Sequence, residues 1–415
     1  MERYRQKDST AYASYSQIDS LEAPDKYTVV VKVKTPNAYI VEELFGSLEY
    51  IVSPELVAEG SGGLTTRAIG TGPYILQKFE YRQGGESVRN PDYWRKDLKG
   101  NVLPYVDSVK VTYIADRATG VAAFRTGQID NPHLATADDR LSLARAMDLR
   151  YFKIGIPSYG GQGMAFKSNK APWNDVRVRR ALNMMLDKDR YNDIVDGKGR
   201  WDYSTPIPWY LVSSEPFTFD KLGPYYKFNP AEGRKLLIEA GFPDGKMKIP
   251  TPMAHGGGQY PDRALAFQAL WKEQGIEFAL LSQDQATYNP YYFSRPFQDI
   301  GLTHHIGAQG NLNWFALNKY HPDASQNTSW VNDPEMNKII AEVKVTLDPA
   351  RTRQLARFIW DFDTLGSYNI WTGTASETYS IVSAHMRNWT PRRGGGNGHV
   401  NEPVPWLSDA PRTSP

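Results

Sequence analysis

The sequence contains no cysteine among its 415 residues. This absence excludes disulfide bonds, a catalytic thiolate, cysteine-ligated zinc and iron–sulfur clusters. No apolar run approaches the roughly 20 residues that a membrane-spanning helix needs. The segment from Met1 to Asp8 has no apolar stretch, so we do not expect it to be a signal peptide. The formal net charge is only +2, which gives no reason to expect a nucleic-acid partner.

Motifs for nucleotide, metal and nucleophile chemistry are missing as well. The run from Gly241 to Met247 lacks the spacing and the hydroxyl of a phosphate-binding loop, and no H-E-x-x-H or G-x-S-x-G pattern occurs. His304 and His305 are adjacent, and neighbours on a strand point to opposite faces, which disfavours a shared metal ion. We therefore predict no catalytic residue, no bound metal and no cofactor.

Aromatic residues make up 13% of the chain, which argues against disorder. At about 150 residues per domain, the length indicates two or three domains or one large body with lobes. Alternating apolar and polar residues predict strands over 27–33 and 108–113. Between them, the turn signal from Gly70 to Tyr74 leads into a third predicted strand, 74–79.

Helix signals dominate the later part of the chain. Side chains that cap helices stand directly before apolar helical patterns at Asn174 or Asp175, at Asn229, at Asp333 and at Asp348, and a proline follows the last three. A further helix is predicted over 263–274, a buried strand over 276–281 and a strand over 368–371. Strands that alternate with helices of this length indicate an α/β protein.

Three arginines follow the cap at Asp175. Because Arg177, Arg179 and Arg180 lie largely off the apolar stripe of their helix, we interpret them as a solvated face, with one of them paired to an acid. The final segment, 392–415, is rich in glycine, proline and serine, and we expect it to be loop-like.

Several short motifs occur in a fixed order between about residue 20 and about residue 390. They are Ile69–Tyr74, Arg89–Trp94, Pro104–Asp107, Asp116–Thr119, Phe124–Asp130, Met164–Lys167, Asp175–Leu182, Leu186–Asp189, Phe228–Phe242 and Gln268–Ile276. Together they resemble one family: the extracytoplasmic solute-binding proteins of the peptide class, family 5, which include the oligopeptide- and dipeptide-binding proteins of ABC importers.

The resemblance implies a periplasmic-binding-protein-like fold of type II, with two discontinuous α/β lobes that close on a solute. Such proteins do no chemistry. They capture a peptide-class solute in the cleft between the lobes and pass it to ABC transporter permease subunits in the membrane. The resemblance further implies a monomer that is periplasmic, or anchored to the membrane outside the cytoplasm, in the full-length parent.

The resemblance also predicts the domain order. We expect a remnant of the accessory domain over 1–68, lobe I over 69–163, a lobe III-like domain over 164–375, a return into lobe I over 376–393 and a tail over 394–415. The first part of the family pattern is absent, so we expect an N-terminally truncated fold with exposed sheet edges and apolar surface.

The ligand site departs from the family pattern. Members that bind peptides place an aspartate shortly after a tryptophan to hold the α-amine. Here His304 or His305 falls at the tryptophan position, and Ala308 or Gln309 at the aspartate. Amides and tryptophans nearby offer other contacts. The predicted ligand-binding residues are Tyr159, Gln162, His304, His305, Gln309, Asn311, Asn313, Trp314, Trp330 and Trp371.

These residues leave several functions open. A peptide is the first expectation, and an oligosaccharide or other neutral polar solute is the second, because aromatic faces and amides suit sugars. For each tryptophan, packing in the core is the alternative to ligand binding. A hydrolase that uses His304 or His305 and a structural remnant that binds nothing are the remaining readings.

Overall fold

The computed structural model describes most of the chain. The described residues are 2–6, 12–41, 52–60, 67–131, 137–147, 149–155, 163–198, 200–207, 209–214, 218–249, 253–255, 260–282, 287, 300–303, 312–324, 327–375, 377–383, 386–387 and 406–407. Within these ranges, no helix combines the length and the apolar character needed to cross a bilayer.

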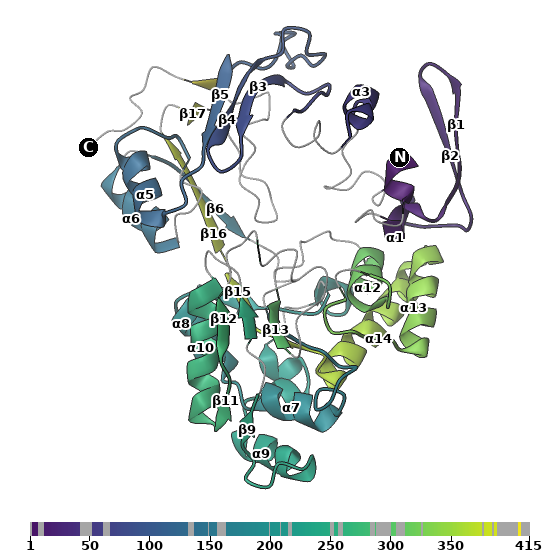
Figure 1. Ribbon diagram of the computed structural model, residues 1–415, viewed down its shortest axis with the longest axis vertical. Helices are drawn as coiled ribbons and strands as arrows, with labels where there is room; N and C mark the ends of the chain where they lie inside the picture. The colour runs from purple at the N-terminus through teal and green to yellow at the C-terminus, as the bar shows by residue number, and fades with distance from the viewer. Residues whose placement is uncertain are drawn as a thin grey trace. The chain divides into compact units, whose positions relative to one another are not determined.

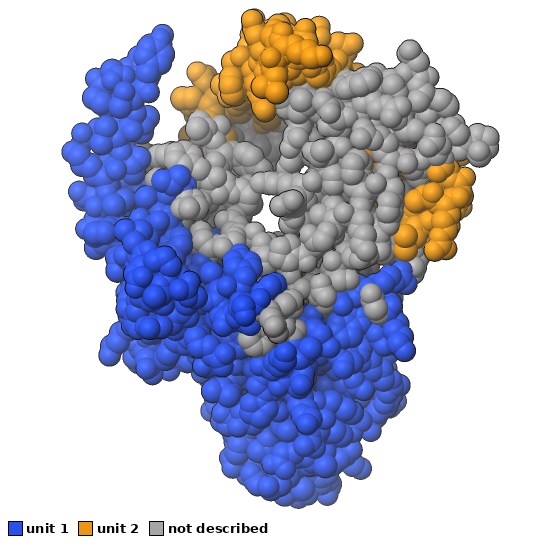
Figure 2. Space-filling model, turned by 180° about the vertical axis from the view of Figure 1, so that it is seen from behind, with its two compact units in different colours: residues 1–49, 157–376 blue, residues 50–156, 377–415 orange. Residues whose placement is uncertain are grey.

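The chain forms two compact units, which Figure 2 shows in different colours. Unit 1 consists of residues 1–49 and 157–376, and unit 2 consists of residues 50–156 and 377–415. The chain therefore passes between the units three times. The finer division into an accessory remnant and lobes that the resemblance implies stays a prediction.

Unit 1 contains most of the helices and a central sheet (Figure 1). Its helices are η1 Glu2–Arg5, α1 Tyr12–Tyr15, α7 Val176–Met184, α8 Lys188–Val195, η2 Trp209–Leu211, η3 Phe219–Lys221, η4 Pro224–Tyr226, α9 Pro230–Glu239, α10 Tyr260–Glu273, α12 Leu312–Tyr320, α13 Pro334–Val345 and α14 Pro349–Gly366. Its strands are β1 Ile18–Asp25, β2 Thr28–Val33, β7 Gly163–Phe166, β8 Trp201–Tyr203, β9 Met247–Lys248, β10 Met253–His255, β11 Ile276–Glu277, β12 Leu280–Ser282, β13 Ile300–Thr303, β14 Asn369–Trp371 and β15 Gly373–Ala375.

The central sheet has five strands in the order β12-β10-β13-β7-β14. Strands β10, β12 and β13 are parallel to one another, and β7 runs antiparallel to both β13 and β14. Four strands therefore point the same way, and β7 alone is reversed. The sheet joins segments that are up to about 200 residues apart in the sequence, because β7 and β14 pair across most of unit 1.

Two apolar cores surround this sheet. In the first, β7, α7 and α10 pack together, and Phe166 stacks on Trp173 with ring centroids 5.4 Å apart. In the second, α12, α13 and α14 enclose Phe315, Trp360 and Trp371, each at most 1% exposed. Aromatic side chains thus form much of the interior, as the high aromatic content predicts.

The predicted helix caps are confirmed. Asp175, Asn229, Asp333 and Asp348 each accept a hydrogen bond from a backbone N–H in the first helical turn, at 2.8 to 3.2 Å. These bonds satisfy N–H groups that have no partner inside the helix. The predicted strands over 27–33, 74–79, 108–113 and 368–371 also appear, within one or two residues at each end.

Two predictions from the sequence are wrong. The run 276–281 is not one strand: β11 pairs with β9 in a separate two-stranded sheet, and β12 joins the central sheet beside β10. Arg179 is not on a solvated face, because it is 4% exposed. Its guanidinium donates to the carbonyls of Trp173 and Gly366, at 2.5 and 2.9 Å. Only Arg177 matches the prediction fully, since it is exposed and pairs with Asp175 at 2.6 Å.

Unit 2 is built from small sheets and short helices. Its elements are α3 Pro54–Ala58, β3 Tyr74–Glu80, β4 Gly84–Arg89, β5 Ser108–Thr112, α5 Arg117–Arg125, α6 Ala137–Ala146, β6 Leu149–Gly155, β16 Glu377–Ser383, β17 Met386–Arg387 and β18 Trp406–Leu407. A meander β3-β4-β5 and the antiparallel pair β6-β16 are its main sheets. The meander exposes apolar side chains such as Phe79, Val88 and Val111, each at least 40% exposed.

Gly233 sets the approach of α9 to α7. A Cβ at this position would lie 2.5 Å from Cγ of Met185 and 3.0 Å from the carbonyl oxygen of Ala181. Helix propensity alone predicts that Gly233→Ala stabilises the protein by up to about 1 kcal/mol. We expect the opposite, a loss of about 1–3 kcal/mol in the free energy of unfolding, because the helices must separate. Urea unfolding measures the difference, and exposed Lys235→Ala on α9 is the control. A gain in stability contradicts this reading.

Lys188 is a buried cation whose titration makes the free energy of unfolding depend on pH. Its ammonium is 2% exposed and donates to the carbonyls of Asn183 and Tyr226, at 2.5 and 3.2 Å. Burial lowers the pKa of Lys188 to about 7. From about pH 7 to about 10 the unfolded chain therefore holds a proton that the folded chain has released, and folded stability rises with pH.

We expect wild type to gain about 2–3 kcal/mol over Lys188→Met between pH 7 and pH 9, since each pH unit contributes about 1.4 kcal/mol per proton. Urea unfolding of both proteins at each pH measures this difference, and exposed Lys227→Met supplies the baseline. A difference between wild type and Lys188→Met that stays constant with pH contradicts the assignment.

Candidate functional site

One edge of the central sheet gathers the ends of several strands. Thr303 at the end of β13 and Trp371 at the end of β14 both pair with Gly163 at the start of β7. Since β10 and β12 are parallel to β13, their last residues, His255 and Ser282, face the same edge. We call this edge, defined by His255, Ser282, Thr303, Trp371 and Gly163, the carboxyl edge. In open α/β sheets, ligands bind beyond the carboxyl ends of strands.

The carboxyl edge brings together the three sequence segments from which the site was predicted. His304 and His305 directly follow Thr303, and Gln162 directly precedes Gly163. Six of the predicted residues lie outside the described residues: Tyr159, Gln162, His304, His305, Gln309 and Asn311. Their side-chain roles stay predictions, while the registers of β7, β13 and β14 establish that their segments begin at one edge.

The four predicted residues that the structure describes are mostly buried. Asn313, in the first turn of α12, is 1% exposed, and Trp371 is likewise 1% exposed. Trp314 is partly buried with its ring edge-on to Phe315, 5.6 Å between centroids. Trp330 has a left-handed backbone with φ of 55°, and the ammonium of Lys167 lies 4.6 Å from its ring centroid.

A buried charged cluster supports Trp371 from one side. The indole Nε1 of Trp371 donates to Oδ2 of Asp363, and Nδ2 of Asn369 donates to Oδ1 of Asp363 at 2.9 Å. The ammonium of Lys319 lies 5.4 Å from the centroid of the Trp371 ring. We call Lys319, Asp363, Asn369 and Trp371 the Asp363 cluster. All four residues are at most 1% exposed.

Burial controls the charges of the Asp363 cluster. It raises the pKa of Asp363, and the hydrogen bonds from Trp371 and Asn369 oppose that shift. It lowers the pKa of Lys319 to about 8, against the attraction of Asp363. The attraction between the two groups opposes the effect of burial on each of them, because it lowers the pKa of Asp363 and raises that of Lys319.

A second buried cluster lies beside the residues that directly follow β14. Arg263 and Asp196 form an ion pair at 2.5 Å, with side chains 6% and 7% exposed. Burial raises the pKa of Asp196, and the charge of Arg263 opposes the shift. Nearby, Oδ1 of Asn192 accepts a hydrogen bond from the N–H of Gly373 at 2.7 Å. A Cβ at Gly373 would lie 2.7 Å from that same amide, so the close approach requires glycine.

Tyr191 links this second cluster to β14. Burial raises the pKa of Tyr191 to about 12, with smaller influences from Arg263, Asp196 and Thr372. We call Tyr191, Asn192, Asp196, Arg263 and Thr372 the Arg263 cluster. Trp371, the last residue of β14, belongs to the Asp363 cluster, and Thr372, which directly follows β14, belongs to the Arg263 cluster. Both clusters therefore adjoin the end of β14.

Sequence reasoning missed the charged residues of both clusters, although weak signals exist for some. Lys319 continues the buried stripe Leu312, Phe315, Ala316 on α12, and Asp363 continues the stripe of Ile359 on α14. A charge at a core position of a helix indicates a buried partner. No sequence signal pairs Asp196 with Arg263, which lie 67 residues apart. Within the described residues, no group of three acidic or histidine side chains gathers to hold a metal ion.

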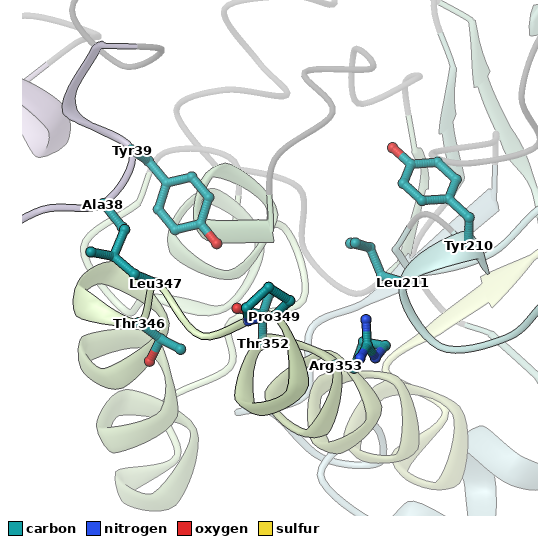
Figure 3. Close-up of a pocket in the computed structure, with 9 residues that line it drawn as sticks. All are labelled: Ala38, Tyr39, Tyr210, Leu211, Thr346, Leu347, Pro349, Thr352 and Arg353. Atoms are coloured by element: carbon teal, nitrogen blue, oxygen red, sulfur yellow. The ribbon is translucent and has the colours of Figure 1, made fainter.

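Unit 1 also contains a cavity of about 340 Å³ (Figure 3). Its lining residues come from the segment after β2, from η2 and from the connection between α13 and α14: Ala38, Tyr39, Tyr210, Leu211, Thr346, Leu347, Pro349, Thr352 and Arg353. None of them belongs to the carboxyl edge, to either buried cluster or to the predicted ligand residues.

The family comparison covers most of the chain. Residues 1–327 match the model of the bacterial extracellular solute-binding proteins, family 5. The chain belongs to this family. Its members are extracytoplasmic proteins of transport systems, and the resemblance seen in the sequence motifs is confirmed.

Curated relatives share about a quarter of their residues with the chain. An ABC transporter peptide-binding protein of Brucella ovis is 26% identical over 406 residues, which span 92% of this chain and 73% of the relative. The glutathione-binding protein GsiB of Pectobacterium atrosepticum is 23% identical over 398 residues, 91% of this chain and 72% of the relative.

Solved structures share the fold. The binding protein AgaA from Agrobacterium tumefaciens R10, in complex with agropinic acid, has a TM-score of 0.82 at 20% identity and covers 95% of this chain and 78% of its own. The periplasmic binding protein DppA from Helicobacter pylori, in complex with the peptide STSA, has a TM-score of 0.80 at 18% identity and covers 98% and 78%. The predicted type II periplasmic-binding fold is confirmed.

The coupling of Lys319 and Asp363 is testable by mutation. Asp363→Asn removes the negative charge near the buried ammonium of Lys319. It also replaces one of the two Asp363 oxygens that accept hydrogen bonds from Asn369 and Trp371. We expect a loss of about 3–5 kcal/mol in the free energy of unfolding. Because Asp363→Asn/Lys319→Met also removes the stranded ammonium, it loses less than the sum of the two single variants. A coupling energy above about 1 kcal/mol in urea unfolding at pH 7 supports the pair, and additivity within about 0.5 kcal/mol contradicts it.

Proposed function

We propose that this chain is the substrate-binding component of an ABC importer and captures a peptide-class solute at the carboxyl edge of unit 1. The observation that carries the proposal is the joint pairing of Thr303 and Trp371 with Gly163, which starts three predicted ligand segments at one edge. Family membership and relatives named for peptide and glutathione binding support the solute class. The partners are the permease subunits of the importer in the membrane, which the protein meets outside the cytoplasm.

The solute is held and released without chemical change. The solute stabilises the bound conformation only by the contacts that it makes in that conformation and not in the other. The difference in affinity between the two conformations therefore drives the conformational change. No catalytic side chain is needed for that cycle, and we propose that the protein is a monomer and not an enzyme. The histidine pair after β13 then serves as a ligand contact and not as a general base.

The amine of a free peptide needs an acceptor at this site. Among the described residues near the carboxyl edge, Asp363 and Asp196 are buried, and each already has a cation for a partner. The amides of Gln309 and Asn311, which the sequence places just after β13, are the acceptors that we propose instead. They suit short peptides and peptide derivatives such as glutathione more readily than a strongly cationic solute.

A panel of di- to pentapeptides, glutathione and oligosaccharides tests the function. We expect a peptide or glutathione to raise the melting temperature by several degrees, since a ligand at about 100 times its Kd adds about 2.7 kcal/mol of stability. Mass spectrometry of the recovered solute should show it intact. A shift with oligosaccharides alone establishes the sugar binder instead, cleavage of the solute establishes a hydrolase, and no shift with any solute contradicts binding.

The role of the carboxyl edge is tested by His304→Ala/His305→Ala. We expect at least a tenfold weaker affinity for the bound peptide in calorimetry, because both residues directly follow Thr303. His321→Ala, in the turn after α12, is the matched control and should stay within twofold of wild type. Unchanged affinity in the double variant places the solute elsewhere.

A further inference from the structure

The cavity between η2 and α14 has rigid walls. The N–H of Ala38 donates to the carbonyl of Lys344 at 2.8 Å, which fixes the segment after β2 to the end of α13. The N–H of Tyr39 donates to Oδ1 of Asn37 at 2.8 Å, and the ring of Tyr39 packs on the core of α12, α13 and α14. Leu211 packs on the same core. The walls of the cavity therefore belong to the folded core of unit 1.

Most of the cavity wall is apolar. Figure 3 shows Tyr39 and Tyr210 on opposite sides, with the first turns of α14 between them. Leu211, Leu347 and Pro349 complete the apolar lining. Leu347 is 80% exposed and Tyr210 is 46% exposed, so apolar surface at the cavity stays open to solvent. An aromatic or aliphatic group fits such a wall.

The two threonines in the lining have no free proton to offer a ligand. The hydroxyl of Thr346 donates to the carbonyl of Glu342 at 2.7 Å, and that of Thr352 donates to the carbonyl of Asp348 at 2.9 Å. Backbone N–H groups at the start of α14 are also engaged, since Asp348 accepts from Ala350 and Arg351 at 3.1 Å. Apart from the hydroxyls of Tyr39 and Tyr210, the polar chemistry of the described lining is thus left to one side chain, which is charged.

That side chain is Arg353. Its neighbours along α14 are paired: Arg351 with Glu342 at 2.6 Å and Arg357 with Asp361 at 2.8 Å. Among the residues that the structure describes, no acceptor pairs with the guanidinium of Arg353, which is exposed. None of the described residues that line the cavity is acidic. One unpaired guanidinium beside apolar walls favours an anion. A carboxylate fits best, because its two oxygens can accept two parallel N–H hydrogen bonds from the guanidinium.

We propose that this cavity is a second ligand site, which binds a small arylalkyl carboxylate. The ring lies between Tyr39 and Tyr210, and the carboxylate pairs with Arg353. A volume of about 340 Å³ is in the range of small-molecule sites. None of the described lining residues belongs to the carboxyl edge, so the proposed site is separate from the proposed site of peptide capture.

The probe for this site is 3-(4-fluorophenyl)propionate, followed by fluorine NMR against wild-type protein. We expect saturable binding, at least tenfold weaker in Arg353→Gln. The neutral analogue 3-(4-fluorophenyl)propionamide should bind wild type at least tenfold more weakly than the acid. Leu347→Glu should also weaken the acid, because it places a negative charge at the cavity. Arg357→Gln, one turn further along α14, is the matched control and should bind as wild type does.

Three results overturn the second site. The first is no saturable binding of the acid to a protein that melts normally. The second is equal affinity for acid and amide, or equal affinity in wild type and Arg353→Gln, since either removes the ion pair from the argument. The third is displacement of the probe by a peptide shown to bind the chain, which places the probe in the peptide site. Failure of peptide binding alone leaves this proposal standing.

Discussion

Strand β7 pairs through both of its edges, and the arrangement of the candidate site depends on those two pairings. It is antiparallel to β13 on one side and to β14 on the other, and Gly163 is the shared partner of Thr303 and Trp371. A slip of one residue in either pairing would exchange the faces of every side chain in that strand. The edge where three distant segments meet therefore exists only in this register.

The two buried clusters explain why that register is held firmly. A charge inside a protein is tolerated only with a partner, and here each cluster beside the end of β14 has one: Asp363 with Lys319, and Asp196 with Arg263. A shift of β14 would break the hydrogen bond between the Trp371 indole and Asp363, and a shift of the adjoining β15 would break the bond between Gly373 and Asn192. Buried charged pairs of this kind favour one geometry of the chain around them more than they add stability. For a binding protein, a fixed edge means that less ordering is needed when the solute arrives.

Local features of this fold were predictable from the sequence, and the buried charges were not. The caps at Asp175, Asn229, Asp333 and Asp348 act within one helical turn, so a few neighbouring residues determine them. The split of 276–281 between two sheets depends on the positions of β9 and β10, which no local pattern contains. The burial of Arg179 depends on acceptors at Trp173 and Gly366, and the latter is 187 residues away.

Residues for the candidate site could be proposed from the sequence, but their arrangement could not. The strand registers show that Thr303 and Trp371 both pair with Gly163, and the ligand contacts of the predicted residues stay a prediction. Trp371 itself is committed to the core through its ring and its Nε1, which a sequence cannot reveal. One fold holds agropinic acid in one similar structure and a peptide in another. Function resides in sites added to a fold and not in the fold itself, so the geometry of the sheet edge does not by itself identify a solute.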